Sequence, residues 1–165
     1  MKTIGLLSDT HGWLDPAVFD HFKDCDEIWH AGDFGSGDLA RELAAFKPLK
    51  GVYGNIDGSD IRYEYPEQIV FDCEEVKVMI RHIGGYPPKY NPATKKELAL
   101  NCPRLFISGH SHILRVMYDE KLQCLHMNPG AAGRQGWHQV RTLLRFAIDG
   151  KEIKNAEVVE LGLRG

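Results

Sequence analysis

The sequence predicts an α/β fold in which two mixed β-sheets pack face to face with helices outside, within a single domain covering residues 1–165. Two features predict it. In the first half of the chain, short apolar runs alternate with helical patterns, as they do in sheets with parallel strands. In the second half, apolar runs are separated only by short polar connections, which indicates antiparallel hairpins. A chain of 165 residues is also long enough to bury a full hydrophobic core.

Five short apolar runs are expected to form buried strands, because each has the length of a strand rather than of a helix. They are Thr3–Ser8, Glu27–His30, Leu49–Tyr53, Val76–Arg81 and Arg104–Ser108.

Three helices are expected, and two of them begin at a capping residue followed by proline. The first opens at Asp15-Pro16, the second runs from about Asp38 to Phe46, and the third opens at Asn91-Pro92 and ends before Pro103. Each carries apolar residues at helical spacing or ends at a residue that cannot continue a helix.

Three hairpins are expected in the remaining sequence. They pair Gln68–Cys73 with Val76–Arg81, His112–Tyr118 with Leu122–Met127, and Val140–Ile148 with Glu152–Leu161. The last pair is joined through Asp149-Gly150, which is typical of a tight hairpin turn because both residues tolerate positive φ.

The composition excludes several classes of function. A net charge of −3 without a basic stripe argues against long nucleic acid as an obligate partner. No apolar run approaches the roughly 18 residues of a membrane span. Because the chain starts with a predicted strand rather than a signal peptide, a cytoplasmic location is expected. The four cysteines lack CxxC spacing, so they are expected to be reduced and structural: Cys25, Cys73, Cys102 and Cys124.

Polar clusters rich in metal ligands follow the predicted strands. They are Asp9-Thr10-His11, Gly32-Asp33, Gly54-Asn55 and Gly109-His110-Ser111-His112, and a further ligand, His82, ends its own strand. Strand ends feed loops at one edge of an α/β sheet, which is where such folds build active sites. These seven ligand-type side chains offer enough carboxylate, amide and imidazole to hold two divalent cations.

Each of the clusters from the first half of the chain is, by itself, weak evidence for a metal site. Asp9 and His11 lie two residues apart and share one face of a strand, but a strand-end aspartate beside a surface histidine has the same pattern. Asp33 follows a glycine that permits a tight turn, yet it also suits a helix or turn cap. Asn55 offers an amide oxygen to a hard cation and an NH₂ group to phosphate, but Gly-Asn is also a common turn.

The paired histidines from the second half of the chain are stronger evidence for a metal site. Two imidazoles two residues apart, after an apolar strand and a glycine, favour metal over a buried core role for His110 and His112. For His82, a hydrogen-bonded core imidazole is an equal alternative. Structural or surface roles are expected for the other histidines, namely His21, His30, His126 and His138.

Taken together, the order DxH, GD, GN, H and GHxH resembles the calcineurin-like metallophosphoesterase superfamily, and is most similar to its small phosphodiesterase branch in bacteria and archaea. The resemblance covers nearly the full chain, including Asn128-Pro129-Gly130. It implies a four-layer αββα sandwich with a dinuclear metal centre. It also implies a first metal held by Asp9, His11, Asp33 and His112, and a second held by Asp33 as a bridge, Asn55, His82 and His110.

The activity implied by the resemblance is hydrolysis of a small phosphodiester by a metal-activated hydroxide. The expected catalytic residues are Asp33, Asn55, Asp57, His82 and His110. Mn²⁺ is the first expectation for the metal, and Fe²⁺, Zn²⁺ or Ni²⁺ suit the same donors. Arg134, in the glycine-rich loop Ala131–Gly136, is either a guanidinium for the substrate phosphate or a solvated loop residue. The chain is expected to act either as a monomer or as a homo-oligomer, and the sequence does not choose between the two.

Three positions depart from the family pattern. Many members carry a histidine two residues after the asparagine, proposed as the general acid for the leaving group, and Asp57 stands at that position here. Because nearby cations favour the carboxylate, we expect Asp57 to be a poor proton donor and Asp57→Asn to cost little activity. Ile83 and Ala131 replace a common glycine and a common serine.

Two other functions are alternatives. A phosphomonoesterase binds a more negative substrate and needs more cationic groups than the sequence offers. A non-catalytic interaction scaffold, like a retromer subunit with a similar fold, has no need of seven ligand-type residues.

The segment Gly84–Asn91 contains Tyr86 and Tyr90 among prolines. These tyrosines either stack on a base or aryl group of the substrate or only pack against the sheet.

Overall fold

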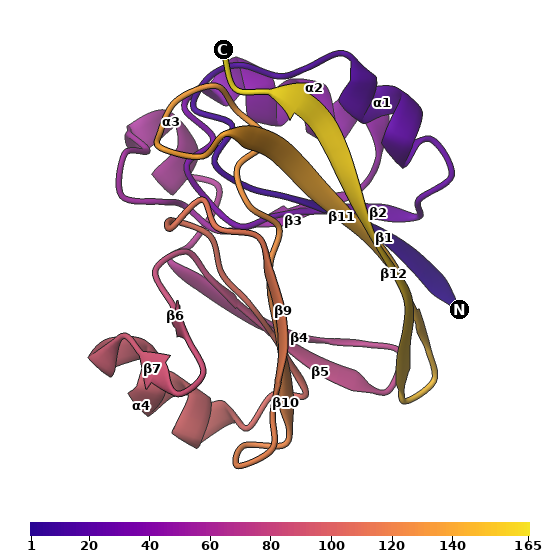
Figure 1. The fold of residues 1–165 in the computed structure, drawn as a ribbon, viewed down its shortest axis with the longest axis vertical. Helices are drawn as coiled ribbons and strands as arrows, with labels where there is room; N and C mark the ends of the chain where they lie inside the picture. The colour runs from indigo at the N-terminus through magenta and orange to yellow at the C-terminus, as the bar shows by residue number, and fades with distance from the viewer.

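Two five-stranded mixed sheets form the centre of the computed structural model, which describes residues 1–165 (Figure 1). In spatial order, the first sheet consists of β12 (Glu152–Leu163), β11 (Val140–Asp149), β1 (Lys2–Leu7), β2 (Glu27–His30) and β3 (Leu49–Gly51). The second consists of β4 (Gln68–Cys73), β5 (Val76–Arg81), β8 (Leu105–Ile107), β10 (Cys124–Asn128) and β9 (Arg115–Asp119).

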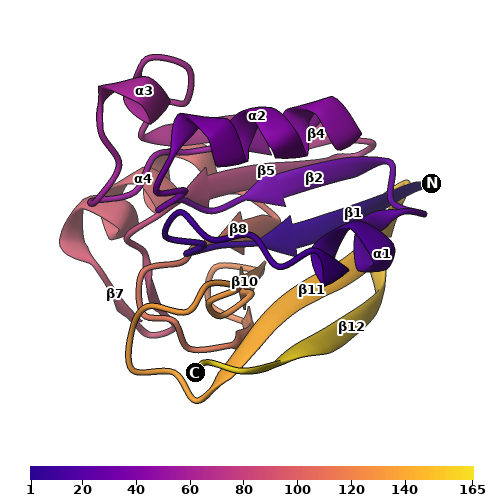
Figure 2. The ribbon, with the colours of Figure 1, turned by 90° about the horizontal axis from the view of Figure 1, so that it is seen from above.

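Helices cover the outer faces of the two sheets. Figure 2, seen from the helix side, shows α1 (Ala17–Phe22) and α2 (Gly37–Phe46) in front of the first sheet. In Figure 1, α4 (Pro92–Asn101) lies beyond the second sheet. The order helix, sheet, sheet, helix confirms the predicted four-layer αββα sandwich. None of the helices is long and apolar enough to cross a membrane.

Strand pairing follows the pattern of the sequence. β1, β2 and β3 are parallel to one another, and a helix connects each to the next. The hairpins β4–β5, β9–β10 and β11–β12 are antiparallel, as predicted. β8 lies between β5 and β10 and is parallel to both. The carboxyl ends of β1, β2 and β3 therefore share one edge of the first sheet, and those of β5, β8 and β10 share one edge of the second.

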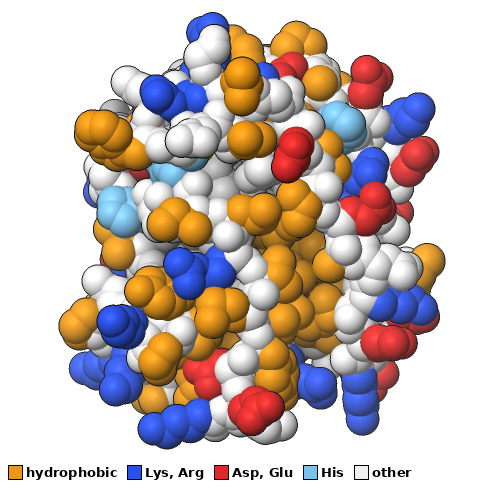
Figure 3. Space-filling view, in the orientation of Figure 1, with side chains coloured by type: hydrophobic (Ala, Val, Ile, Leu, Met, Phe, Trp, Pro, Cys, Tyr) orange, Lys and Arg blue, Asp and Glu red, His pale blue; other side chains and the backbone are white.

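The main core lies between the sheets and centres on Trp29, which is fully buried. Its indole meets Phe71 of the second sheet and Phe146 of the first edge-to-face, at centroid distances of 5.0 and 5.8 Å. The contact with Phe71 crosses between the two sheets and helps to hold them at a fixed separation. In Figure 3, hydrophobic side chains gather near the middle of the face shown, so the apolar interior approaches the surface on this side.

Capping residues and periodicity in the sequence predicted most of the helices and strands, but not the shortest ones. The Asn91 side chain caps α4, accepting from the N–H groups of Ala93 and Thr94, as predicted. Asp15 accepts from the Ala17 N–H at 2.9 Å, but the helix begins one residue later than expected. The single-turn α3 (Ser59–Arg62) and the small hairpin β6 (Gly85–Tyr86) with β7 (Lys89–Tyr90) are too short for periodicity to predict. All four cysteines are free thiols, and only Cys102 is exposed.

A buried carboxylate fastens the start of β2. Glu27 is 5% exposed and accepts hydrogen bonds from Lys2, Lys50 and the Trp29 indole. Burial raises the pKa of Glu27, but these three donors outweigh it and lower the pKa to about 2. Glu27 therefore stays ionised in the folded chain well below the ordinary pKa of a glutamate.

This shift predicts acid sensitivity. The folded pKa lies below the unfolded value of 4.5, so the stabilisation is complete above about pH 4.5 and is lost as the pH falls towards 2. Glu27→Gln is expected to destabilise the fold by on the order of 2–3 kcal/mol at pH 7 and to flatten the loss of stability between pH 5 and 2. Thermal unfolding across this range, with the exposed Glu157→Gln as control, measures both effects. An unchanged pH slope in Glu27→Gln contradicts the prediction.

Candidate metal centre

The predicted ligands leave the strand ends in strained backbone conformations. Five of them have positive φ: Asp9 at 54°, His11 at 48°, Asp33 at 58°, His110 at 70° and His112 at 62°. Residues other than glycine adopt this region rarely, at a cost of about 1–3 kcal/mol that the surrounding structure must offset. Strain concentrated at one edge of the sandwich marks this edge as a functional site.

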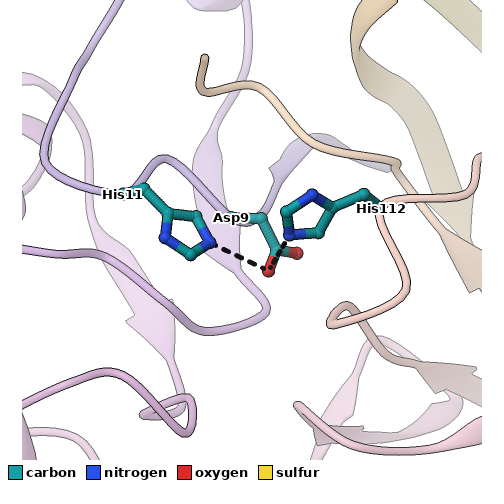
Figure 4. A group of neighbouring side chains, drawn as sticks. All are labelled: Asp9, His11 and His112. Carbon is teal, nitrogen blue, oxygen red and sulfur yellow. Dashed lines mark ion pairs between the residues drawn. The ribbon is translucent and has the colours of Figure 1, made fainter. Parts of the chain in front are cut away.

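The first cluster consists of Asp9, His11 and His112 (Figure 4). Asp9 is fully buried, and its Oδ1 lies 3.2 Å from His112 Nε2 and 3.8 Å from His11 Nε2. Its Oδ2 accepts from the Ser8 hydroxyl at 2.6 Å and the His110 N–H at 3.1 Å. Asp9 Oδ1 and His11 Nε2 are buried without a hydrogen-bond partner. Buried polar atoms that converge in this way need a further partner, and a cation fits them.

The second cluster consists of Asp33, His82 and His110, with Asn55 beside them. Asp33 Oδ2 lies 3.2 Å from His82 Nε2 and 3.5 Å from His11 Nε2, so this one oxygen faces both clusters. Asp33 Oδ1 accepts from the Ile56 N–H at 3.0 Å. Asn55 Oδ1 lies 3.1 Å from His82 Nε2 and 3.0 Å from His110 Nδ1. The four side chains therefore converge from the ends of β2, β3, β5 and β8.

Backbone contacts orient His82. Its Nδ1 lies 2.7 Å from the Ala31 carbonyl, which can only accept, so Nδ1 carries the proton. The lone pair of Nε2 then points towards Asp33 and Asn55, which is the orientation of a metal ligand.

Two of the motif positions require glycine, because ligand side chains lie too close to leave room for a Cβ atom. A Cβ at Gly32 would collide with the His82 ring, and a Cβ at Gly54 would collide with the Asp33 carboxylate. Gly32 also has a φ of 106°, in agreement with the tight turn predicted there.

The electrostatics of the site favour positive charge. Burial alone raises the pKa of Asp9, but the neighbouring imidazoles of His11 and His112 lower it far below its usual range. Burial likewise raises the pKa of Asp33, and the adjacent His82 imidazole outweighs this effect. The neighbouring Asp9 carboxylate raises the pKa of His11 in turn. Both carboxylates are therefore ionised, and the site attracts cations.

The donors of each cluster lie close enough to share one ion, because their ligand atoms all fall within 4.8 Å of one another. Carboxylate oxygen and imidazole nitrogen suit Mn²⁺, Fe²⁺, Zn²⁺ and Ni²⁺. The residues present thus fit divalent metal ions at two adjacent positions.

Asp57 does not face this centre. It is 4% exposed, and its Oδ2 accepts from the N–H groups of Phe34 at 3.2 Å and Gly54 at 2.9 Å. Its Oδ1 accepts from the Gly35 N–H at 2.9 Å. The carboxylate thus ties the loop of Asp33 to the loop of Asn55. This geometry argues against the catalytic position predicted for Asp57, because its place in the sequence did not reveal the side to which it turns.

Arg134 lies in an exposed loop, and its guanidinium stacks over the Trp13 ring at 4.2 Å. Arg141 approaches the same ring at 4.8 Å and pairs with Asp15 at 2.7 Å. The indole holds Arg134 next to the loop of His11, and no contact with a candidate ligand forms.

One contributor, His138, was not predicted from the sequence. Its Nε2 lies 2.8 Å from the Gly133 carbonyl, so Nε2 carries the proton and Nδ1 is an acceptor. That Nδ1 lies 3.3 Å from His112 Nδ1. His138 therefore accepts from His112 and leaves His112 Nε2 free to face Asp9. The signal in the sequence was its position just after a glycine-rich loop. His30, by contrast, is structural as predicted, buried and stacked on Phe34.

The fold and these clusters define a metallophosphoesterase-type centre. The model of the calcineurin-like phosphoesterase superfamily domain matches residues 1–151. A probable metallophosphoesterase of Methanothermobacter thermautotrophicus is 32% identical over 167 residues, covering 96% of this chain and 92% of that protein. The chain belongs to the calcineurin-like phosphoesterase superfamily, as the order of its motifs predicted.

Solved structures share the fold at low sequence identity. An archaeal phosphodiesterase has a TM-score of 0.73 and 24% identity, covering 95% of this chain and 99% of that chain. Vps29 of Chaetomium thermophilum has a TM-score of 0.76 and 15% identity, covering 98% and 97%. These neighbours confirm the fold class, and the same fold serves proteins with different names and roles.

The contacts of Asp57 reverse the expectation made for its amide variant. Asp57→Asn places an NH₂ group among three backbone N–H donors, so at least one of them loses its acceptor. The expected cost is on the order of 2–3 kcal/mol in the free energy of unfolding, together with weaker metal binding, because two ligand loops lose their tie. Chemical denaturation measures the loss, with the exposed Asp24→Asn as control. Stability equal to that of the wild type contradicts this role.

His138→Ala removes the acceptor that orients His112. The expected result is a roughly 10- to 100-fold weaker affinity for Mn²⁺ with little change in melting temperature. Calorimetric titration of metal-stripped protein measures the affinity, and His21→Ala serves as a control distant from the cluster. Wild-type affinity in His138→Ala would show that His112 needs no such partner.

Proposed function

We propose that this chain is a metal-dependent phosphodiesterase that hydrolyses a small phosphodiester at a dinuclear centre. The observation that carries the proposal is the position of Asp33 Oδ2, which faces an imidazole of each ligand cluster. A carboxylate placed between two cation positions is suited to bridge them, and paired metals clamp both the attacking and the leaving oxygen of a phosphoryl group.

In this proposal the ligands divide as the family resemblance implied. Asp9, His11, Asp33 and His112 would hold one cation, and Asp33, Asn55, His82 and His110 would hold the other. Two divalent cations, with Mn²⁺ as the first expectation, would supply charge for the phosphoryl oxygens and activate the attacking water.

The chain itself keeps the ligand atoms in place. One oxygen of Asp9 and one of Asp33 are fastened by backbone or hydroxyl donors, which leaves the other oxygen of each for a cation. His82 is fixed through the Ala31 carbonyl. Groups held in this way need little reorganisation when charge develops on the substrate. Asn55 is exposed and keeps its NH₂ group to donate to a phosphate oxygen.

Two cavities support a diester over a monoester. One has a volume of about 340 Å³ and includes Asn55, His82 and Arg62 in its lining. The other has about 310 Å³ and includes His110. The two cavities flank the second ligand cluster, so each can take one of the two ester groups of a diester. A monoester would use only one of them.

Neither residue following Asn55 suits proton donation to a leaving group. Ile56 is exposed and apolar, and Asp57 faces the backbone of two loops. The leaving group is therefore expected to depart nearly as an anion, which makes nitrophenyl diesters the appropriate first substrates.

The scaffold alternative rests on the fold shared with Vps29 proteins. It predicts no turnover of any diester under any added metal, whereas the enzyme hypothesis predicts turnover that metal removal abolishes.

Asp33→Asn is expected to damage the centre more than Asn55→Ala, because Asp33 serves both cations and contributes charge. Hydrolysis of bis(p-nitrophenyl) phosphate with added Mn²⁺ should fall at least about 100-fold in Asp33→Asn and roughly tenfold in Asn55→Ala. Metal content by elemental analysis should fall from two ions per chain in Asp33→Asn. The exposed Asp72→Asn is the matched control. Equal metal content in Asp33→Asn and the wild type would refute the bridging role.

A further inference from the structure

The cavity of about 310 Å³ beside His110 lies between the second sheet and the β6–β7 hairpin. Residues from the hairpin, β9 and β10 line it, and none of the lining residues is acidic. This volume is at the small end of the range for small-molecule sites. Because His110 belongs both to this lining and to the second ligand cluster, the cavity opens directly beside the candidate metal centre.

His126 is the group in this cavity that the fold does not explain. Its neighbours Leu125 and Met127 point into the core between the sheets, so His126 faces the outer side of β10. It is 1% exposed, and neither ring nitrogen has a hydrogen-bond partner. Buried polar groups in folded proteins are nearly always paired, so an unpaired imidazole at a cavity indicates a ligand that completes its hydrogen bonds.

The protonation state of His126 indicates which kind of ligand would complete its hydrogen bonds. Its ring stacks on Phe106, with centroids 5.2 Å apart and an interplanar angle of 29°. Burial lowers the pKa of His126 to about 4, so the ring is neutral at pH 7 and offers one N–H donor and one acceptor. A neutral group that both donates and accepts matches the edge of a heterocycle better than it matches phosphate.

A planar wall completes the cavity. The Arg115 guanidinium stacks on the Tyr86 ring at 4.0 Å and forms no ion pair with a carboxylate. Guanidinium and aromatic planes are the surfaces on which nucleobases stack in proteins. Tyr90 differs, because its hydroxyl donates to Asp119 at 2.6 Å and its ring packs against Phe106. Of the two tyrosine hypotheses, stacking therefore fits Tyr86 and packing fits Tyr90.

We propose that this cavity binds the nucleobase of a nucleotide diester whose phosphate lies at the metal centre. The inference rests on the proposed phosphodiesterase function and adds its substrate class. The base would hydrogen-bond to His126 and lie against the Tyr86–Arg115 pair, with His110 between the base and the phosphate.

His126→Phe tests the proposal, since phenylalanine keeps the stacking on Phe106 and removes both nitrogens. The substrates are thymidine 5′-(p-nitrophenyl) phosphate, which carries a base, and bis(p-nitrophenyl) phosphate, which carries none. We expect the variant to raise KM for the thymidine diester about tenfold, the effect of one buried hydrogen bond. KM for the other diester should change much less, because a nitrophenyl group lacks the hydrogen-bonding edge of a base. Its melting temperature should not fall, because an unpaired buried polar group is removed. Arg115→Met should also raise KM for the thymidine diester more than KM for bis(p-nitrophenyl) phosphate.

Calorimetric titration with adenosine and thymidine separates this inference from the proposed function. Wild-type binding of a nucleoside that is lost in His126→Phe supports the cavity, even if no diester is hydrolysed and the phosphodiesterase proposal fails. Hydrolysis of both diesters with equal KM in the wild type and His126→Phe overturns the cavity proposal while the phosphodiesterase stands. Equal nucleoside binding in the two proteins also overturns it.

Discussion

Two ionised carboxylates, Asp9 and Asp33, are buried at one edge of the sandwich, and the rest of the centre is organised around them. Burying a charge is costly unless hydrogen bonds and opposite charge compensate for it. Backbone and hydroxyl donors satisfy one oxygen of each carboxylate. The other oxygens face imidazoles that come from both sheets, so the centre exists only when the sheets are packed against each other.

The packed sheets provide the rigidity that this arrangement needs. Contacts across the interior, such as that of Trp29 with Phe71, set the spacing between the two sheets whose strand ends carry the ligands. The ligand loops leave these strands with positive φ, and hydrogen bonds from neighbouring loops hold them there. Conformational strain and buried charge are thus concentrated at the edge that the core keeps in place.

The side chains around the centre have different roles, which follow from their positions. Asp57 joins two ligand loops from behind, and His138 orients His112 from the side. The open side faces two cavities, of which one holds His126 and the Tyr86–Arg115 pair. A preorganised centre with cavities on both sides supports the proposed hydrolysis of a diester.

The sequence alone determined the strand order along the chain, the hairpins and the residue types at the strand ends, because these depend on local periodicity, turn chemistry and ligand chemistry. From these came the fold class and the seven candidate ligands, and the order of those ligands along the chain resembled that of a known family. Tertiary structure decided where side chains point and what they meet. Asp57 lies two residues from Asn55 yet faces away, His138 meets His112 across a loop, and His126 is unpaired. Such contacts join segments distant in the sequence, and only the packing of the sheets brings them together.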